Sequence, residues 1–294
     1  MRFGLLGAGH WAEHTHAAAL AVHPHAELAG VWGRRPEAAA AVAERHGTRP
    51  YPSVDALLAD CDAVAVALPP DVQAPLAVRA AEAGKHLLLD KPLATTPAGA
   101  REVVAAVERG GVRSVVFFTL RFAPDSARWL AEQTVNGGWT VGRADWYSPV
   151  FGGADSPYAA SPWRQEKGAL WDIGPHALSV LLPVLGDLGD LDEPGVLTAV
   201  RGPGDTVHLV LRHLDGASST VLVSHSMPPA AAGVVAELRG TAGVARMTER
   251  DDPPTVAFAR AVDALLDAEQ HPCDVRFALR VTEILAAAES RLGG

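Results

Sequence analysis

The N-terminus of the chain carries a glycine-rich turn between an apolar segment and a helical pattern. The apolar run ends at Leu6, Gly7-Ala8-Gly9-His10-Trp11-Ala12 follows, and a helical pattern continues to Leu20. In a strand–turn–helix unit of this kind, the first glycine permits a tight turn and the second lets the backbone approach a pyrophosphate. A small third residue lets the helix pack closely on the strand, and the helix N-terminus faces the anion. An ordinary strand-to-helix turn is the alternative, but this context predicts a dinucleotide site formed by Gly7, Gly9, His10, Trp11 and Ala12.

Strand and helix patterns alternate over residues 1–120. Helical segments at 36–46, 73–83 and 96–109 separate short apolar segments, which lie at 27–32, 62–68, 86–90 and 114–119. Continuous apolar strands that alternate with helices are typical of a parallel sheet covered on both faces. We therefore predict an α/β fold with a doubly wound Rossmann domain over 1–120.

The pattern changes after residue 121. A helix is predicted for 125–134, a strand for 141–150 and a second helix after Asp172. Consecutive antiparallel strands with hairpin turn signals are then predicted for 196–201, 206–214, 218–226 and 234–247. We predict an α+β domain with a mainly antiparallel sheet over 121–294, whose last helix, at 273–292, is able to pack back on the first domain.

The composition limits the classes of partner. A net charge of -9 disfavours nucleic acid, which binds basic surfaces. Two cysteines make no disulfide framework and fit a reducing compartment. No apolar run approaches the ~20 residues of a membrane span. The first apolar residues belong to the phosphate-loop strand, so removal of a signal peptide would destroy the site. We expect a cytoplasmic protein with no nucleic-acid partner and no membrane partner.

The residues after the second apolar segment bear on the cofactor. Folds that bind NAD often carry an acidic residue about 20 positions beyond the glycines, whereas an arginine accommodates the extra phosphate of NADP. Here Gly33 is followed by Arg34 and Arg35, and guanidinium groups match phosphate geometry. We predict that all three residues contact the cofactor and that NADP(H) is favoured over NAD(H). Alternatively, both arginines are solvated and Glu37 approaches the ribose.

A lysine follows the apolar segment at 86–90. Ligands of open parallel sheets bind beyond the carboxyl ends of the strands, so Lys91 is predicted to lie near the cofactor, on a turn stiffened by Pro92. By itself, a lysine at the end of a strand is usually a surface charge.

Asp172 and His176 lie four residues apart, within Gly168-Ala169-Leu170-Trp171-Asp172-Ile173-Gly174-Pro175-His176. On a helix or its first turn they share a face, where a carboxylate can orient an imidazole and tune its proton affinity. Oxidation of a secondary alcohol needs a base for the hydroxyl proton, and histidine suits that role near neutral pH. Alone, such a pair is more often a local hydrogen bond. Together with the glycine loop, the pair and Lys91 predict a catalytic site.

The sequence resembles the family of glucose–fructose oxidoreductase, inositol dehydrogenase and the rhizopine-catabolism protein MocA (Gfo/Idh/MocA). The motifs described above follow the same order as the motifs of that family over nearly the whole chain. The family's Glu-Lys-Pro corresponds to Asp90-Lys91-Pro92. Its Trp-Arg and Asp-x-Gly-x-His elements correspond to Trp163-Arg164 and to the segment that ends at His176. Its Gly-Thr-x-Gly turn corresponds to residues 240–243.

The resemblance implies an active site between a Rossmann domain and an antiparallel-sheet domain. By analogy, His176 is the general acid or base, Lys91 binds the reacting oxygen, and Asp172 orients His176 or holds a neighbouring hydroxyl. Trp163 and Arg164 would line the substrate site, with Arg164 near the cofactor phosphates or the substrate. The family acts on sugars, cyclitols or their derivatives, and often forms homodimers or homotetramers through the open face of the second sheet.

The sequence departs from the family pattern in three places. Asp90 replaces the common Glu, which shortens a side chain expected near the cofactor ribose. Leu68, Pro69 and Gln73 stand where the family often has Thr-Pro and then a histidine; we still expect them to contact the cofactor, although Gln73 cannot act as a base. The chain is also short for the family, which puts an insertion or a terminal arm of the substrate domain in doubt.

Other interpretations stay open. His10 and His14 are one helical turn apart, but no acidic or cysteine third ligand is evident, so we predict no metal. The leading hypothesis is an NADP-dependent oxidoreductase acting on a carbohydrate-like substrate. A non-catalytic dinucleotide-binding sensor or scaffold on the same fold is the alternative, because a fold does not determine a function. Reduction of an imine or of a linear-tetrapyrrole-like bond is a third interpretation.

Overall fold

A computed structural model describes residues 1–153, 156–247 and 252–293. The chain divides into two compact units. Unit 1 comprises Met1–Ala123 and Asp252–Thr282, and unit 2 comprises Pro124–Asp251 and Glu283–Gly294. The first change of unit lies close to the boundary predicted at 120. The chain then returns to unit 1 over Asp252–Thr282, a range that includes the first part of the last helix, for which packing on the first domain is predicted above.

Unit 1 contains a five-stranded sheet with the order β2-β1-β3-β4-β5, whose paired strands are all parallel. The strands are β1 (Arg2–Leu6), β2 (Glu27–Trp32), β3 (Ala63–Val66), β4 (His86–Asp90) and β5 (Ser114–Phe117). The predicted parallel sheet is therefore confirmed. The chain runs outward in one direction from β1 to β2 and in the other from β3 to β5. The loops after β1 and β3 thus form the switch point at which ligands of such sheets bind.

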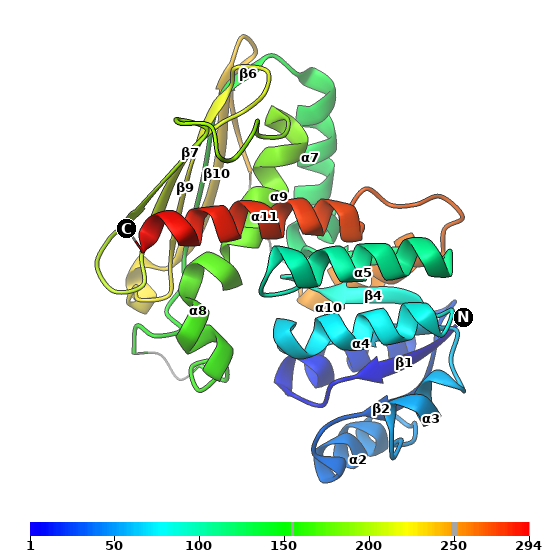
Figure 1. The fold of residues 1–294 in the computed structure, drawn as a ribbon. Coiled ribbons are helices and arrows are strands. Elements are labelled where there is room, and N and C mark those ends of the chain that lie inside the picture. Colours follow the sequence, from blue (N-terminus) through cyan, green and yellow to red (C-terminus); the bar gives the residue numbers. More distant parts are fainter. Residues whose placement is uncertain (154–155, 248–251, 294) are drawn as a thin grey trace. The chain divides into compact units, whose positions relative to one another are not determined.

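Helices cover both faces of this sheet (Figure 1). The helix after β1 begins as a π-helical segment, η1 (Ala12–Ala17), and continues as α1 (Ala18–Val22). The other helices of unit 1 are α2 (Pro36–Arg45), α3 (Val54–Leu58), α4 (Pro70–Glu82), α5 (Pro97–Gly110), α6 (Thr119–Phe122), α10 (Pro254–Leu266) and the first part of α11 (Val275–Leu292). Figure 1 shows α4 and α5 in front of β4, with α10 behind it. Helix α10 is not among the helices predicted from the sequence.

Local sequence signals explain where these helices begin and end, and α5 is an example. Its first residue is Pro97, whose missing N–H costs nothing at that position. The preceding Thr96 caps the helix, because its Oγ1 accepts from the Gly99 N–H at 3.2 Å. The helix ends at Gly111, whose φ of 59° is a left-handed conformation that glycine adopts without strain.

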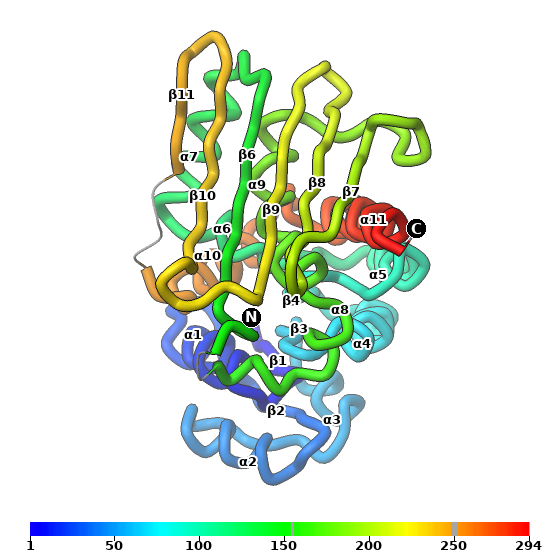
Figure 2. The backbone as a smooth tube through the Cα atoms, turned by 90° about the vertical axis from the view of Figure 1, so that its left-hand side faces the viewer, coloured from blue at the N-terminus to red at the C-terminus, as the bar shows by residue number. Residues whose placement is uncertain are grey.

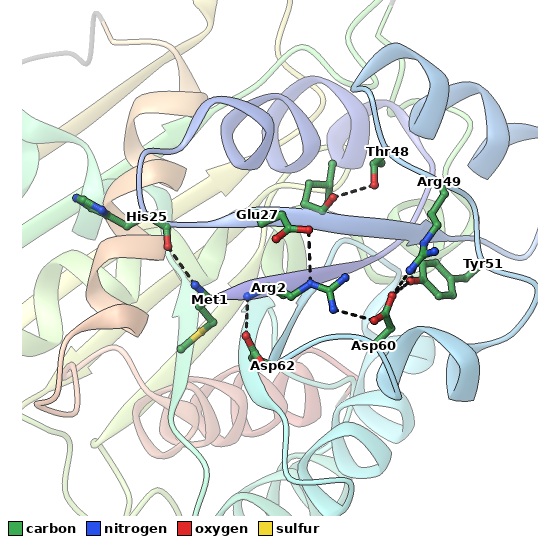
Figure 3. A network of polar contacts seen from close by, with 10 residues as sticks. Met1, Arg2, His25, Glu27, Thr48, Arg49, Tyr51, Asp60 and Asp62 are labelled. Carbon is green, nitrogen blue, oxygen red and sulfur yellow. Dashed lines mark hydrogen bonds and ion pairs between the residues drawn. The ribbon is translucent and has the colours of Figure 1, made fainter.

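A network of charged groups joins segments of unit 1 at the start of β1 (Figure 3). The Asp60 carboxylate accepts from Arg2 Nη1 at 2.7 Å, and also from Arg49 and the Tyr51 hydroxyl. These donors hold the pKa of the Asp60 carboxyl well below its usual range. Arg2 also donates its Nε to Glu27 at the start of β2. The network therefore ties β1 and β2 to the segments around α3.

Unit 2 contains a six-stranded sheet with the order β11-β10-β6-β9-β8-β7 (Figure 2). The strands are β6 (Trp139–Tyr147), β7 (Leu197–Arg201), β8 (Val207–Arg212), β9 (Ser218–Ser224), β10 (Gly233–Gly240) and β11 (Gly243–Arg246). All neighbours are antiparallel except β6 and β9. The mainly antiparallel sheet is confirmed, but β9 and β10 do not pair with each other. The reason is that β6, which comes much earlier in the chain, lies between them.

The helices of unit 2 cover one face of its sheet. They are α7 (Pro124–Asn136), α8 (Pro162–Asp172), α9 (Gly174–Leu185) and the last part of α11 (Val275–Leu292), with a short 3-10 turn η2 at Pro229–Ala231. Gly142 of β6 faces α9, since a Cβ added there would lie 2.5 Å from Leu185 Cδ1. The side chains that precede and follow Gly142 in the strand therefore point to the opposite face of the sheet.

The stretch Pro162–Leu185, which comprises α8 and α9, is apolar. An 18-residue window within it has a mean hydropathy of 1.3, and among the described helices this stretch alone is long and apolar enough to cross a membrane. However, 83% of this window is buried inside the protein. Such burial is what a core helix of a globular unit shows.

Candidate active site

The predicted phosphate loop lies at the switch point of the unit 1 sheet. Gly7 has a φ of 137°, and a Cβ there would lie 2.5 Å from the carbonyl oxygen of Ala67 at the end of β3. The Gly7 N–H donates to the Trp32 carbonyl at 2.8 Å, at the end of β2. Only glycine fits this position, because both the backbone angle and the close approach exclude a side chain.

Gly9 differs from Gly7, because the space in front of it is open. A Cβ built on Gly9 meets no atom within 4 Å, and the helix begins directly afterwards at Ala12. The first N–H groups of a helix have no partner within the helix and attract anions. Ala12 is buried, and its small side chain lies 3.4 Å from the position of a Cβ on Gly7. These residues fit a dinucleotide pyrophosphate.

This difference between the two glycines leads to a prediction. We expect Gly9→Val to fold with an unchanged melting temperature but to bind NADPH at least about tenfold more weakly, since the added side chain fills the space for the phosphates and removes charge-assisted hydrogen bonds. Gly7→Val is the matched comparison and should lower the melting temperature. Thermal denaturation and a fluorescence titration with NADPH measure both effects. Unchanged NADPH affinity in Gly9→Val would contradict this assignment of the loop.

Gly33, Arg34 and Arg35 lie beside the phosphate loop. A Cβ on Gly33 would lie 3.0 Å from the Ala8 Cβ, so the two loops are in contact. Arg34 and Arg35 are exposed directly before α2, and within the described residues neither side chain makes an ion pair or a hydrogen bond. Arg45, at the end of the same helix, pairs with Glu13 instead. Two unpaired guanidinium groups beside the phosphate loop are thus available to a ligand.

Gln73 stabilises the turn that carries Lys91. Gln73 is fully buried; its Oε1 accepts from the Asp90 N–H at 2.8 Å, and its Nε2 donates to the carbonyls of Asp90 at 2.7 Å and Pro92 at 3.1 Å. The Asp90 carboxylate accepts from the Lys91 N–H at 3.0 Å. The Gln73 amide is thus bonded to the main chain of the turn, and its contact with the cofactor stays a prediction. Lys91 is partly exposed, and its peptide bond to Pro92 is cis.

Leu68 and Pro69 follow β3 directly. Both are partly exposed and connect the strand to α4, which begins at Pro70. They continue from Ala67, whose carbonyl faces Gly7, so they lie next to the phosphate loop. The structure thus groups the other predicted unit 1 residues around the ends of β1 to β4.

Three histidines occupy the helix after the phosphate loop. His10 and His14 are exposed and stacked, with ring centroids 4.1 Å apart. His16 is fully buried against Phe258, and burial lowers its pKa to about 3, so it is neutral. Among the described residues, no group of three potential metal ligands occurs.

Asp172 and His176 lie at the junction of α8 and α9 in unit 2. Both are buried, and Ile173 separates the two helices. The Asp172 Oδ2 accepts from Arg164 Nε at 2.7 Å and contacts His225 Nε2 at 3.1 Å. The Arg164 guanidinium lies over the rings of Tyr158 and Trp163, 4.8 and 4.7 Å from their centroids. In this unit Arg164 is therefore bound to Asp172 and held between two aromatic rings.

Two aromatic or imidazole groups extend this cluster beyond the predicted residues. The Trp146 ring of β6 stacks on His176, with centroids 4.6 Å apart and an angle of 27° between the planes. His225, just after β9, is buried against Asp172. The alternation along β6 places Trp146 on the same side as Gly142, toward α9, which the sequence could have indicated. No pattern in the sequence indicates that His225 approaches Asp172.

Comparison with known proteins agrees with these features. Residues 1–118 match the family described as "Oxidoreductase family, NAD-binding Rossmann fold" (GFO_IDH_MocA). A dTDP-3,4-didehydro-2,6-dideoxy-alpha-D-glucose 3-reductase of Streptomyces antibioticus is 30% identical to this chain. The alignment covers 100% of this chain and 90% of that protein. The chain belongs to the Gfo/Idh/MocA family of oxidoreductases. A D-glucoside 3-dehydrogenase of Escherichia coli is 32% identical over 63% of this chain and 54% of that protein.

Solved structures show the same fold. A levoglucosan dehydrogenase in complex with NADH and levoglucosan superimposes with a TM-score of 0.84 at 20% identity, covering 100% of this chain and 97% of that one. The WlbA dehydrogenase of Bordetella pertussis, in complex with NADH and UDP-GlcNAcA, gives a TM-score of 0.82 at 24% identity, covering 99% and 95%. As a member of this family, the protein is an enzyme with an NAD-binding Rossmann fold, which favours catalysis over a sensor role.

Proposed function

We propose that the protein is an NADP-dependent oxidoreductase that transfers a hydride between nicotinamide and a secondary alcohol or ketone of a sugar, a cyclitol or a related metabolite. Position 3 of a sugar ring is our specific proposal, since the relatives from Streptomyces antibioticus and Escherichia coli are named as a 3-reductase and a 3-dehydrogenase. The observation that carries the proposal is the buried pair Asp172 and His176 in a chain that also has a phosphate loop at its switch point.

Each residue has a role in this proposal. NADP supplies or accepts the hydride when it is bound. His176 gives a proton to, or takes one from, the reacting oxygen. The Lys91 ammonium donates a hydrogen bond to that oxygen and stabilises its negative charge. Asp172 orients His176 or holds a neighbouring hydroxyl, and Trp163 contacts the substrate.

The preference for NADP rests on Arg34 and Arg35. Both guanidinium groups are exposed beside the phosphate loop and unpaired within the described residues. Arginine binds phosphate through two parallel hydrogen bonds, which suits the extra phosphate of NADP. Glu37 is exposed in the first turn of α2, and a carboxylate there would bind the ribose hydroxyls of NAD instead.

The decisive test is turnover. Purified protein is assayed for NADPH and NADH oxidation against keto-sugars and inososes, and for the reverse reaction with the matching alcohols. We expect turnover with at least one 3-keto sugar and a product reduced at that carbon, which product analysis identifies. Cofactor binding without turnover across the whole panel would instead favour a sensor, and reduction of a C=N bond would favour the third interpretation.

We also propose that the protein works in the cytoplasm as a homodimer or homotetramer joined through the open face of its six-stranded sheet. Both cysteines, Cys61 and Cys273, are buried free thiols, which suits a reducing compartment. The sheet face opposite α9 exposes a set of apolar side chains: Val141, Val200, Val210, Val235 and Val244. Its charged groups are largely neutralised internally, since Glu237 pairs with Arg239 and Arg246. Such a face suits burial against a second copy.

A single charge should disrupt this assembly. Val210 of β8 is 53% exposed on the open face, and we expect Val210→Glu to weaken association at least about tenfold, because a buried unpaired carboxylate is costly. The control is Val135→Glu on α7, where the side chain is 86% exposed away from the sheet. Light scattering during gel filtration measures the mass over a range of concentrations. A wild-type monomer at all concentrations, or equal behaviour of the two variants, would exclude this interface.

A further inference from the structure

The starting observation is the environment of the Asp172 carboxylate. One oxygen, Oδ2, accepts from Arg164 Nε at 2.7 Å and lies 3.1 Å from His225 Nε2. The exposed fraction of the side chain is 8% for Asp172 and 1% for His225. In so dry an environment each hydrogen bond to the charge counts for more than it would in water. His225 was not among the residues predicted from the sequence.

The hydrogen-bond chemistry determines the state of His225. The guanidinium of Arg164 favours the ionised form of Asp172, and an ionised carboxylate only accepts. The His225 Nε2 must therefore carry a proton and donate it. The other ring nitrogen, Nδ1, is buried and has no hydrogen-bond partner within the described residues. A proton on Nδ1 would leave a buried donor unsatisfied, so we assign the donated proton to Nε2.

Asp205 fixes the position of His225. Its Oδ1 accepts from the His225 N–H at 2.9 Å and from the Ser226 hydroxyl at 2.7 Å. Its Oδ2 accepts from the Ala169 N–H of α8 at 3.0 Å. Gly168 permits that contact, because its φ of 63° interrupts α8. In a continuous helix the Ala169 N–H would instead bond within the helix. One carboxylate thus ties the end of β9 to the helix that carries Asp172.

We propose that His225 is a positioning residue, which holds Asp172 ionised and in a single orientation by donating from Nε2, while Asp205 keeps the backbone of His225 in register with α8. The proposal rests on the proposed function, in which Asp172 orients His176 or a substrate hydroxyl. Its physical consequence does not need turnover, because a hydrogen bond to the charged form lowers the pKa of a carboxyl. Loss of the donor must therefore raise the pKa of Asp172.

The test compares four proteins: wild type, His225→Leu, His225→Gln and His213→Leu. Glutamine can place an amide N–H near the position of Nε2, whereas leucine cannot donate. His213 is the matched control, since it is also buried in unit 2 and bonded through both ring nitrogens, to the Gly186 carbonyl and the Ser219 hydroxyl, but not to Asp172. Without cofactor, a carbon-13 NMR titration of carboxyl groups gives the pKa of Asp172, and nitrogen-15 NMR gives the tautomer of His225.

We expect the pKa of Asp172 to rise by about one unit or more in His225→Leu, to return most of the way in His225→Gln, and to stay unchanged in His213→Leu. Turnover, measured as kcat, should fall about tenfold in His225→Leu and recover in His225→Gln, and the affinity for NADPH should stay unchanged in both variants.

If wild type shows no turnover while the pKa of Asp172 rises as expected in His225→Leu, the proposed function fails and the positioning role stands. An unchanged pKa in His225→Leu, or a proton on Nδ1 in the wild-type protein, overturns the role of His225. The tautomer is measured on wild type, so the test holds even if a variant does not fold.

Discussion

Replacing His176 or Lys91 by alanine should reduce kcat by about 10³-fold, the range that proton transfer and charge stabilisation by a single side chain contribute. NADPH should still bind with affinity within about threefold of wild type, since the phosphate loop and the arginines remain. Steady-state kinetics with the best substrate of the panel and a fluorescence titration with NADPH measure the two effects.

The control for this result is His25→Ala. His25 is an exposed histidine just before β2, so its loss removes an imidazole without touching the cluster around Asp172 or the open face of the six-stranded sheet. It should retain full activity. If His176→Ala and Lys91→Ala both kept most of the wild-type rate, the catalytic roles assigned to these two residues would be wrong.

The second large effect concerns the cofactor. We expect the double variant Arg34→Ala/Arg35→Ala to lower kcat/KM for NADPH about 100-fold, since two charge-assisted contacts to a phosphate are removed, and to leave kcat/KM for NADH nearly unchanged. Initial rates with both cofactors, at fixed substrate, give this ratio.

Arg45→Ala is the matched control for the cofactor experiment. Arg45 lies at the end of α2, the helix that Arg34 and Arg35 precede, and its guanidinium pairs with Glu13. Its replacement therefore also removes a positive charge, but it removes no proposed phosphate contact. Should wild type prefer NADH, and should Glu37→Ala weaken NADH binding, the ribose would be held by Glu37 and the preference for NADP would be refuted.

Much of unit 1 was predictable because its signals are local. Each strand of the parallel sheet is a short apolar run, and β3 is buried at every residue. Turn residues mark the ends of helices, as Thr96 and Gly111 do for α5. The spacing of Gly7, Gly9 and Ala12 likewise identifies the phosphate loop, because each residue meets a steric condition that arises within a few positions of the chain.

Other features depended on contacts between distant residues. Gln73 follows β3 in the chain, yet its amide is bonded to the turn after β4, a contact that no local pattern indicates. Helix α10 belongs to unit 1, although the chain before it, from Pro124 on, belongs to unit 2. The parallel pairing of β6 with β9 joins strands that are far apart in the chain, as at the pair Val141 and Ser218.

The sequence by itself determined the fold class, the phosphate loop and the residues Lys91, Asp172 and His176 as the chemical candidates, because periodicity, glycine spacing and short motifs act over a few neighbouring residues. Only the tertiary structure decided which groups surround Asp172. Arg164 reaches it from the start of α8, and His225 reaches it from the end of β9, where Asp205 holds it. The contacts of His225 with Asp172 and Asp205 join residues 53 and 20 positions apart in the chain, so they form only when the fold buries these segments together, which no local pattern records.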